Sequence, residues 1–207
     1  MPVHPVLWAI LAAVVAIEVL QQLALAGLVP PSWVRWLDLL AFYDVMFEHA
    51  LAGGGGWGQV ALSSVGHAFL HAGWLHLGLN MAAFLGLGHA IAQAIGPVRL
   101  VATFVVCAIA GAVTFGLLAD IDGALVGASG AVFGFLGMIT AWQERALARR
   151  GLSRRPIWYR IAGLVAINAA LDLGLGGLLA WEAHLGGFVA GWLLALAWPP
   201  ARLRLPF

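Results

Sequence analysis

Four polar side chains in an otherwise apolar sequence are of types that can carry out acyl-transfer chemistry. They are His76, Asn80, Ser129 and His184. A serine hydroxyl is a weak nucleophile until a neighbouring imidazole takes its proton, so a serine beside a histidine is the simplest activated nucleophile. Histidine, asparagine and backbone N–H groups can donate hydrogen bonds to the oxyanion that forms when the hydroxyl attacks a carbonyl. The four residues therefore predict a serine hydrolase site, provided that the fold brings them together.

The composition indicates which solvent surrounds these residues. Hydrophobic residues make up 63% of the 207 positions and charged residues only 9%, whereas soluble domains are about half apolar and about a quarter charged. The formal net charge of +1 gives no reason to expect a nucleic-acid partner. The chain is therefore predicted to be an integral, multi-pass membrane protein surrounded by lipid. Polar groups inside a membrane are costly, so each of the four needs a reason to be there.

Six apolar stretches approach or exceed the roughly 20 residues that span a bilayer. They lie at about 6–28, 68–90, 98–118, 127–143, 158–177 and 182–198. The fourth and sixth are short and rich in Gly and Ala, so we expect them to pack among other helices. Residues 1–207 are thus predicted to form one all-α domain with six transmembrane helices. The long first loop, at about 30–66, is rich in aromatic residues, and part of it is expected in the outer membrane interface.

The arginine positions predict how the spans are oriented. Six spans place nine of the ten arginines on one side, Arg202 and Arg204 among them, and leave only Arg35 on the other. Because basic residues are retained in the cytoplasm, both termini are predicted to be cytoplasmic. Asp120 and Asp122 then lie outside, and all four candidate residues fall in the outer half of the membrane.

Glycine spacing predicts which spans are in contact. Gly130 and Gly134 are four residues apart in the fourth span, and Gly187 and Gly191 are four apart in the sixth. Such small-residue stripes let helix backbones approach closely. The stripe in the sixth span shares a helix face with His184, so packing of the two spans would bring this histidine towards the serine of the fourth.

The second span supplies possible oxyanion donors. His76 and Asn80 are four residues apart and therefore project from one face of a helix. Together with the backbone N–H of Ser129, they could donate hydrogen bonds to the oxyanion. Ser129 lies near the N-terminus of the fourth span, where the helix dipole favours developing negative charge.

Three segments carry these residues in a recognisable order. They read His71-Ala-Gly-Trp-Leu-His76-Leu-Gly-Leu-Asn80, Gly127-Ala-Ser129-Gly130 and His184-Leu-Gly-Gly187-Phe-Val-Ala-Gly191. In sequence and spacing they resemble the rhomboid family of intramembrane serine proteases. The six spans and the aromatic first loop extend the resemblance over nearly the whole chain, as a minimal six-transmembrane bacterial type.

The resemblance implies a rhomboid-like bundle with a Ser129–His184 dyad that has no acidic third member, and an oxyanion site made by His76 and Asn80. It implies an acyl-enzyme intermediate and cleavage of transmembrane protein substrates near the outer face, with no metal and no cofactor. A bacterial inner membrane is the implied location. Some members place a Tyr one helical turn after the serine, stacked on the histidine, and Phe133 occupies that position here. The residues expected to support the site are His71, Gly127, Gly130, Phe133, Gly187 and Gly191.

The sequence departs from the family pattern in the first loop, and other functions are alternatives to the protease interpretation. Many members have a Trp-Arg pair before the second span, whereas Trp57 is followed here by Gly58 and Gln59. A catalytically silent rhomboid-like chaperone or binding protein is one alternative, although such proteins generally lack the serine or the histidine. A small transporter is another, but it predicts an internal repeat that is not evident. A zinc protease would need a His-Glu-x-x-His run, and none exists.

Overall fold

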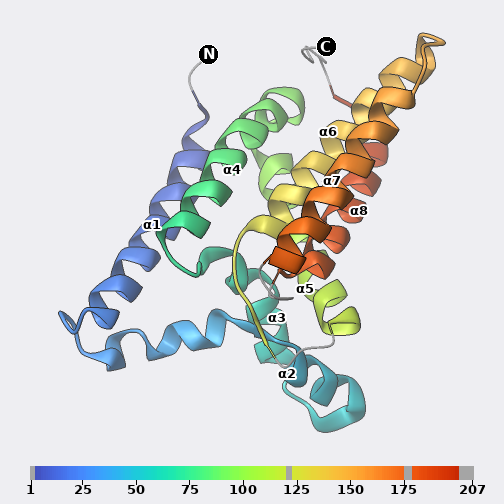
Figure 1. The fold of residues 1–207 in the computed structure, drawn as a ribbon. Helices are drawn as coiled ribbons and strands as arrows, with labels where there is room; N and C mark the ends of the chain where they lie inside the picture. Colours follow the sequence, from blue (N-terminus) through green and yellow to red (C-terminus); the bar gives the residue numbers. More distant parts are fainter. Residues whose placement is uncertain (1–2, 120–122, 175–178, 201–207) are drawn as a thin grey trace.

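The computed structural model describes residues 3–119, 123–174 and 179–200. Its longest helices are α1 (Pro5–Leu25), α4 (Trp74–Ile95), α5 (Pro97–Leu118), α6 (Ser129–Arg149), α7 (Arg155–Gly174) and α8 (Trp181–Ala197). They run alternately up and down, so α1 begins and α8 ends at the same end of the bundle (Figure 1). The predicted all-α membrane bundle is confirmed. Asp120, Asp122, Arg202 and Arg204, which helped to orient the spans, lie outside the described residues.

The long helices differ in how readily they could cross a membrane. By length and composition, α1, α4, α5 and α7 are suited to do so. α8 has 17 residues. The helix of the fourth predicted span, 127–143, begins at Ser129 and continues beyond residue 143 to Arg149. Gln143, Glu144 and Arg145 end the apolar run but are good helix formers, so the polar end of α6 stays helical.

The second span begins later than predicted. Hydropathy places it at 68–90, but α4 spans Trp74–Ile95. The residues before it form a short 3-10 helix, η4 (His67–Phe69), and Gly73 then has φ of +102°, which a continuous α-helix does not contain. His71 therefore lies in the connection before α4, not one turn before His76 on the same helix. The helix ends at Gly96, whose φ is +83°.

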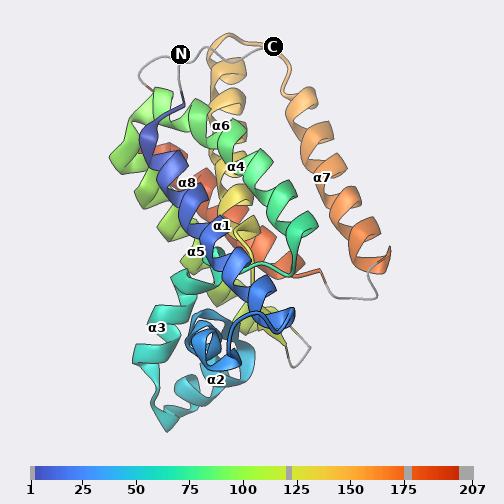
Figure 2. The same cartoon turned by 90° about the vertical axis from the view of Figure 1, so that its left-hand side faces the viewer.

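The segment between α1 and α4 is folded and lies at one end of the bundle (Figures 1 and 2). Its elements are η1 (Pro31–Trp33), η2 (Arg35–Leu40), β1 (Phe42–Tyr43), α2 (Asp44–His49), η3 (Ala50–Gly54), α3 (Trp57–Gly66) and η4. β1 pairs antiparallel with β2 (Ala124–Leu125). Phe42 and Phe47 are buried with Phe115 of α5, and the Trp57 ring meets Phe47 edge-on at a centroid distance of 6.3 Å. Aromatic packing thus anchors this segment to α5, while its place in the membrane interface stays a prediction.

The core is centred on α6, which packs most extensively against α8 and also contacts α5 and α4. Phe84, Phe104 and Phe135 form its aromatic centre, with Phe84 and Phe135 stacked at a centroid distance of 5.8 Å. By contrast, α7 is loosely held and is the outermost helix in Figure 2. Among its described residues only Ile157 is buried. The bundle therefore fixes α6 and α8 firmly and α7 weakly.

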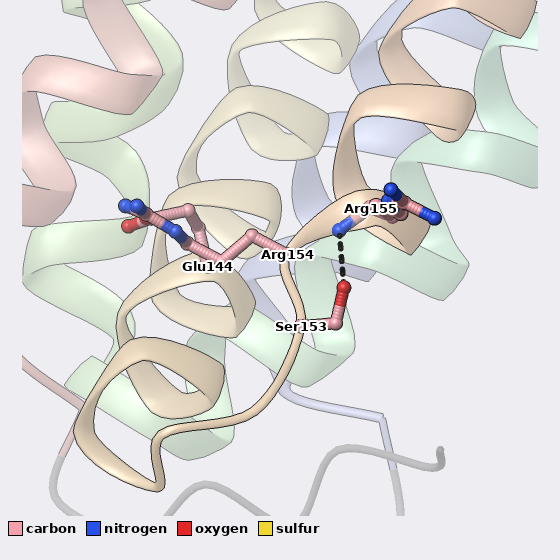
Figure 3. A network of polar contacts seen from close by, with 4 residues as sticks. All are labelled: Glu144, Ser153, Arg154 and Arg155. Carbon is pink, nitrogen blue, oxygen red and sulfur yellow. Dashed lines mark hydrogen bonds and ion pairs between the residues drawn. The ribbon is translucent and has the colours of Figure 1, made fainter.

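A polar hairpin connects α6 to α7. Arg154 forms an ion pair with Glu144 at 2.9 Å, and the backbone N–H of Arg155 donates to Ser153 Oγ at 3.3 Å (Figure 3). Ser153 is exposed. This hairpin lies at the opposite end of α6 from Ser129.

Candidate active site

Ser129 is the first residue of α6 and is half-buried. The first hydrogen bond of the helix runs from Val132 N to Ala128 O, at 3.0 Å. The N–H groups of Ser129, Gly130 and Ala131 therefore lack partners within the helix, as at every helix N-terminus. They carry the positive end of the helix dipole, which favours negative charge beside the serine.

The two glycine stripes bring α6 and α8 into backbone contact. A Cβ atom at Gly187 would overlap the carbonyl oxygen of Gly130, and one at Gly191 would overlap the carbonyl oxygen of Gly134. Only glycine permits so close an approach. The register also shows that the two helices are parallel, since both pairs advance by four residues. The predicted packing of the fourth span against the sixth is confirmed.

His184 is buried in the first turns of α8, with an exposed fraction of 8%. Its ring stacks on Phe133, with centroids 4.1 Å apart and planes 7° from parallel. Phe133 lies one helical turn after Ser129, so this stack places the histidine ring beside the face of α6 that carries the serine. Within the described residues, Ser129 Oγ forms no hydrogen bond to the ring. Catalytic hydrogen bonds are often long before substrate binds.

The ring of His76 lies against Gly127, two residues before Ser129. A Cβ atom at Gly127 would come within 2.7 Å of His76 Cε1 and 2.9 Å of His76 Nε2. The backbone N–H of Ala72 donates to His76 Nδ1 at 3.3 Å. A neutral imidazole with an accepting Nδ1 carries its hydrogen on Nε2. His76 therefore presents an N–H donor near the start of α6.

Asn80 is buried, one turn after His76 on α4. Its Nδ2 donates to the carbonyl oxygen of His76 at 3.0 Å. A side-chain amide nitrogen has two hydrogens, so one remains to donate elsewhere. His71 lies beside this pair, its ring edge-on to that of His76 at a centroid distance of 5.1 Å. Burial lowers the pKa of His71 to about 4, and the neighbouring His76 lowers it as well.

The sequence indicates no partner for His67. In the structure this residue contacts Gly127, two residues before Ser129. His67 is fully buried. Its carbonyl oxygen accepts from Gly127 N at 2.9 Å, and its Nε2 lies 3.3 Å from the carbonyl oxygen of Ala108 on α5. Burial lowers the pKa of His67 to about 4, so this ring is neutral at physiological pH. No local pattern around His67 indicates either contact.

Asn168 is the second residue that sequence reasoning missed. It lies on α7, and its Oδ1 is 2.6 Å from His184 Nδ1. An amide inside an apolar span is the signal that could have drawn attention to it. Asp172, one turn further on, accepts a hydrogen bond from Leu179 N at 3.2 Å.

An apolar cavity of about 710 Å³ lies beside His184, between α7 and α8. Most of its lining is aliphatic or aromatic, from side chains of both helices and from Phe133. His184 and Asn168 are among the few polar groups in its wall. The histidine ring is therefore reached from an apolar space on the side of α7.

Comparison with known proteins gives consistent matches. The family model described as the rhomboid domain matches residues 58–200. The chain is 34% identical over 155 residues to the mitochondrial Rhomboid protein 1 of Saccharomyces cerevisiae, covering 69% of this chain and 44% of that protein. It is 28% identical over 150 residues to Rhomboid protease GluP of Bacillus subtilis, covering 72% and 28%. RHOMBOID-like protein 5 of Arabidopsis thaliana is 32% identical over 136 residues, covering 61% and 40%. Each match spans less than half of the relative's length.

Proposed function

We propose, from the premise that this chain belongs to the rhomboid family, that it is an intramembrane serine endopeptidase with Ser129 as nucleophile and His184 as base. The observation that carries the proposal is the backbone contact between α6 and α8. It sets the His184 ring on Phe133, one turn from Ser129. Relatives named as proteases, such as Rhomboid protease GluP, support the reaction class.

The proposed reaction proceeds through an acyl-enzyme. His184 Nε2 takes the proton of Ser129 Oγ as the oxygen attacks the scissile carbonyl carbon, and the imidazolium then protonates the leaving amine. A water molecule, deprotonated by the same ring, attacks the ester, and the proton returns to Ser129 as the acid product leaves. No metal or cofactor takes part.

Three donors are proposed to stabilise the oxyanion: the backbone N–H of Ser129, the Nε2–H of His76 and the free N–H of Asn80. Preorganised donors of this kind are effective because they need no reorganisation during the reaction. Gly127 supports them, since its lack of a side chain leaves room for the ring of His76.

The proposed substrates are transmembrane proteins, cleaved near the outer face of a bacterial inner membrane. Residues 1–207 would form a single transmembrane domain with both termini in the cytoplasm. The apolar cavity beside His184 supports a substrate that arrives from lipid, since it offers an apolar segment a comparable environment.

The proposal is tested by labelling the purified, reconstituted protein with a fluorophosphonate and following cleavage of a single-span substrate in liposomes. Two results together would support it: phosphonylation mapped to Ser129 by mass spectrometry, and a loss of cleavage proportional to the fraction of protein labelled. Cleavage that continues after full labelling, or labelling at another serine, would end it. A silent binding protein would instead retain intact substrate and leave Ser129 unlabelled.

Replacing Gly127 with alanine is expected to lower kcat about 100-fold or more. Gly127 has φ of +116°, and the new methyl group would meet the His76 ring. Strained backbone costs on the order of 1–3 kcal/mol, and loss of one oxyanion donor costs roughly 10²–10³ in rate. Gly96→Ala is the matched control, because Gly96 also has positive φ but no atom within 4 Å of its Cβ position. Equal effects of the two changes on kcat would contradict the role given to His76.

A further inference from the structure

His184 has a hydrogen-bond partner on α7, a helix that is otherwise weakly attached to the bundle. Asn168 Oδ1 lies 2.6 Å from His184 Nδ1, a short distance for a hydrogen bond with nitrogen. Asn168 is half-buried and lies in the C-terminal half of α7, a helix with one buried side chain among its described residues. Its side chain lines the apolar cavity between α7 and α8.

The hydrogen bonds of Asn168 fix which atom of its amide faces the histidine. Its Nδ2 donates to the carbonyl oxygen of Leu164 at 2.9 Å, and a carbonyl oxygen can only accept. The amide oxygen is therefore the atom directed at His184. Because that oxygen also can only accept, His184 Nδ1 must carry a hydrogen, which leaves the lone pair of a neutral ring on Nε2.

We propose that Asn168 is a positioning residue that holds His184 in the tautomer and ring orientation required of the base. The inference rests on the proposed peptidase function. It gives the dyad a third, uncharged member supplied by α7. The stack on Phe133 fixes the plane of the imidazole, but it does not fix rotation within that plane or the position of the hydrogen. The contact with Asn168 fixes both.

The first test compares kcat and KM for two variants of Asn168. Asn168→Leu is expected to lower kcat about 10- to 100-fold, by analogy with the loss caused by removing the hydrogen-bond partner of a metal-bound histidine, with KM within about twofold. Asn168→Asp keeps an accepting oxygen and is expected to recover most of that loss. Its carboxylate also stabilises the imidazolium, so the acid limb of the pH–rate profile should move to higher pH.

Ala166→Leu is the matched control, because it places the same side chain on an exposed position of α7. It is expected to leave kcat unchanged. The inference fails if Asn168→Leu and Ala166→Leu give the same kcat, or if Asn168→Asp is as slow as Asn168→Leu with an unshifted pH profile. Either result would reduce Asn168 to a contact that merely holds α7 in place.

The second test does not depend on cleavage. Nitrogen-15 chemical shifts of the His184 ring, assigned by comparison with His184→Gln in micelles, report which nitrogen carries the hydrogen. The wild-type protein is expected to show a protonated Nδ1, and Asn168→Leu a shift towards the Nε2–H tautomer. A wild-type Nε2–H tautomer would overturn the inference even in an active protease. The expected tautomer in a protein without peptidase activity would overturn only the proposed function.

Discussion

Ser129→Ala is expected to lower the rate of substrate cleavage by at least about 10⁴-fold. Removing the proposed nucleophile would end acyl-enzyme formation and leave only the small acceleration that binding and the proposed oxyanion donors provide. The free energy of unfolding should change little, because the Ser129 side chain makes no hydrogen bond among the described residues. The rate is measured in liposomes with a single-span substrate, and folding is checked by the thermal unfolding midpoint in micelles.

Two further variants sharpen this experiment. Ser153→Ala is the matched control, since Ser153 is exposed at the other end of α6 (Figure 3) and should be fully active. His184→Ala should be about as slow as Ser129→Ala, and the double variant no slower than either, because a nucleophile and its base act as one unit. Additive losses would show that the two residues do not act together, and cleavage by Ser129→Ala at the wild-type rate would refute the nucleophile.

Local sequence patterns predict the parts of this fold that depend on local physics. Apolar runs predict the long helices, because a membrane leaves backbone groups no other partner than their own helix. Glycine spacing predicts the contact between α6 and α8, because a residue without a side chain leaves room for the backbone of the facing helix. The glycines are Gly130 and Gly134 on α6, and Gly187 and Gly191 on α8. These patterns also place Ser129 and His184 on helices that touch.

The features that local sequence patterns do not predict depend on contacts between segments far apart in the chain. Residues 68–73 are apolar enough to be predicted as part of the second span, yet they precede α4 instead of belonging to it. Gly73 adopts positive φ, and the carbonyl oxygen of His67 accepts a hydrogen bond from Gly127 N. The partner of Asn168 depends on how α7 is rotated about its own axis against α8. Hydropathy marks Asn168 as unusual but carries no information on that rotation.

Replacing Gly187 with leucine is expected to separate α6 from α8 and to reduce cleavage below about 1% of the wild-type rate. The new side chain would begin inside the carbonyl group of Gly130, and backbone cannot give way as a flexible side chain can. Overpacking of a close contact costs roughly 1–3 kcal/mol and occasionally more. We expect about 3 kcal/mol here, measured as a loss in the free energy of unfolding in micelles. His184 lies one turn before Gly187, so its position beside Phe133 should be lost with the contact.

Gly163→Leu separates this effect from the general cost of replacing a helical glycine. Gly163 lies on α7, and no atom lies within 4 Å of its Cβ position. Because leucine favours helix over glycine by a fraction of a kcal/mol to about 1 kcal/mol, this control should be as stable as the wild-type protein or slightly more so, and active. Gly187→Ala should fall between Gly187→Leu and the wild type, since a methyl group displaces the helices less. If Gly187→Leu were as stable and active as Gly163→Leu, the close approach of α6 and α8 could not be what holds His184 beside the serine.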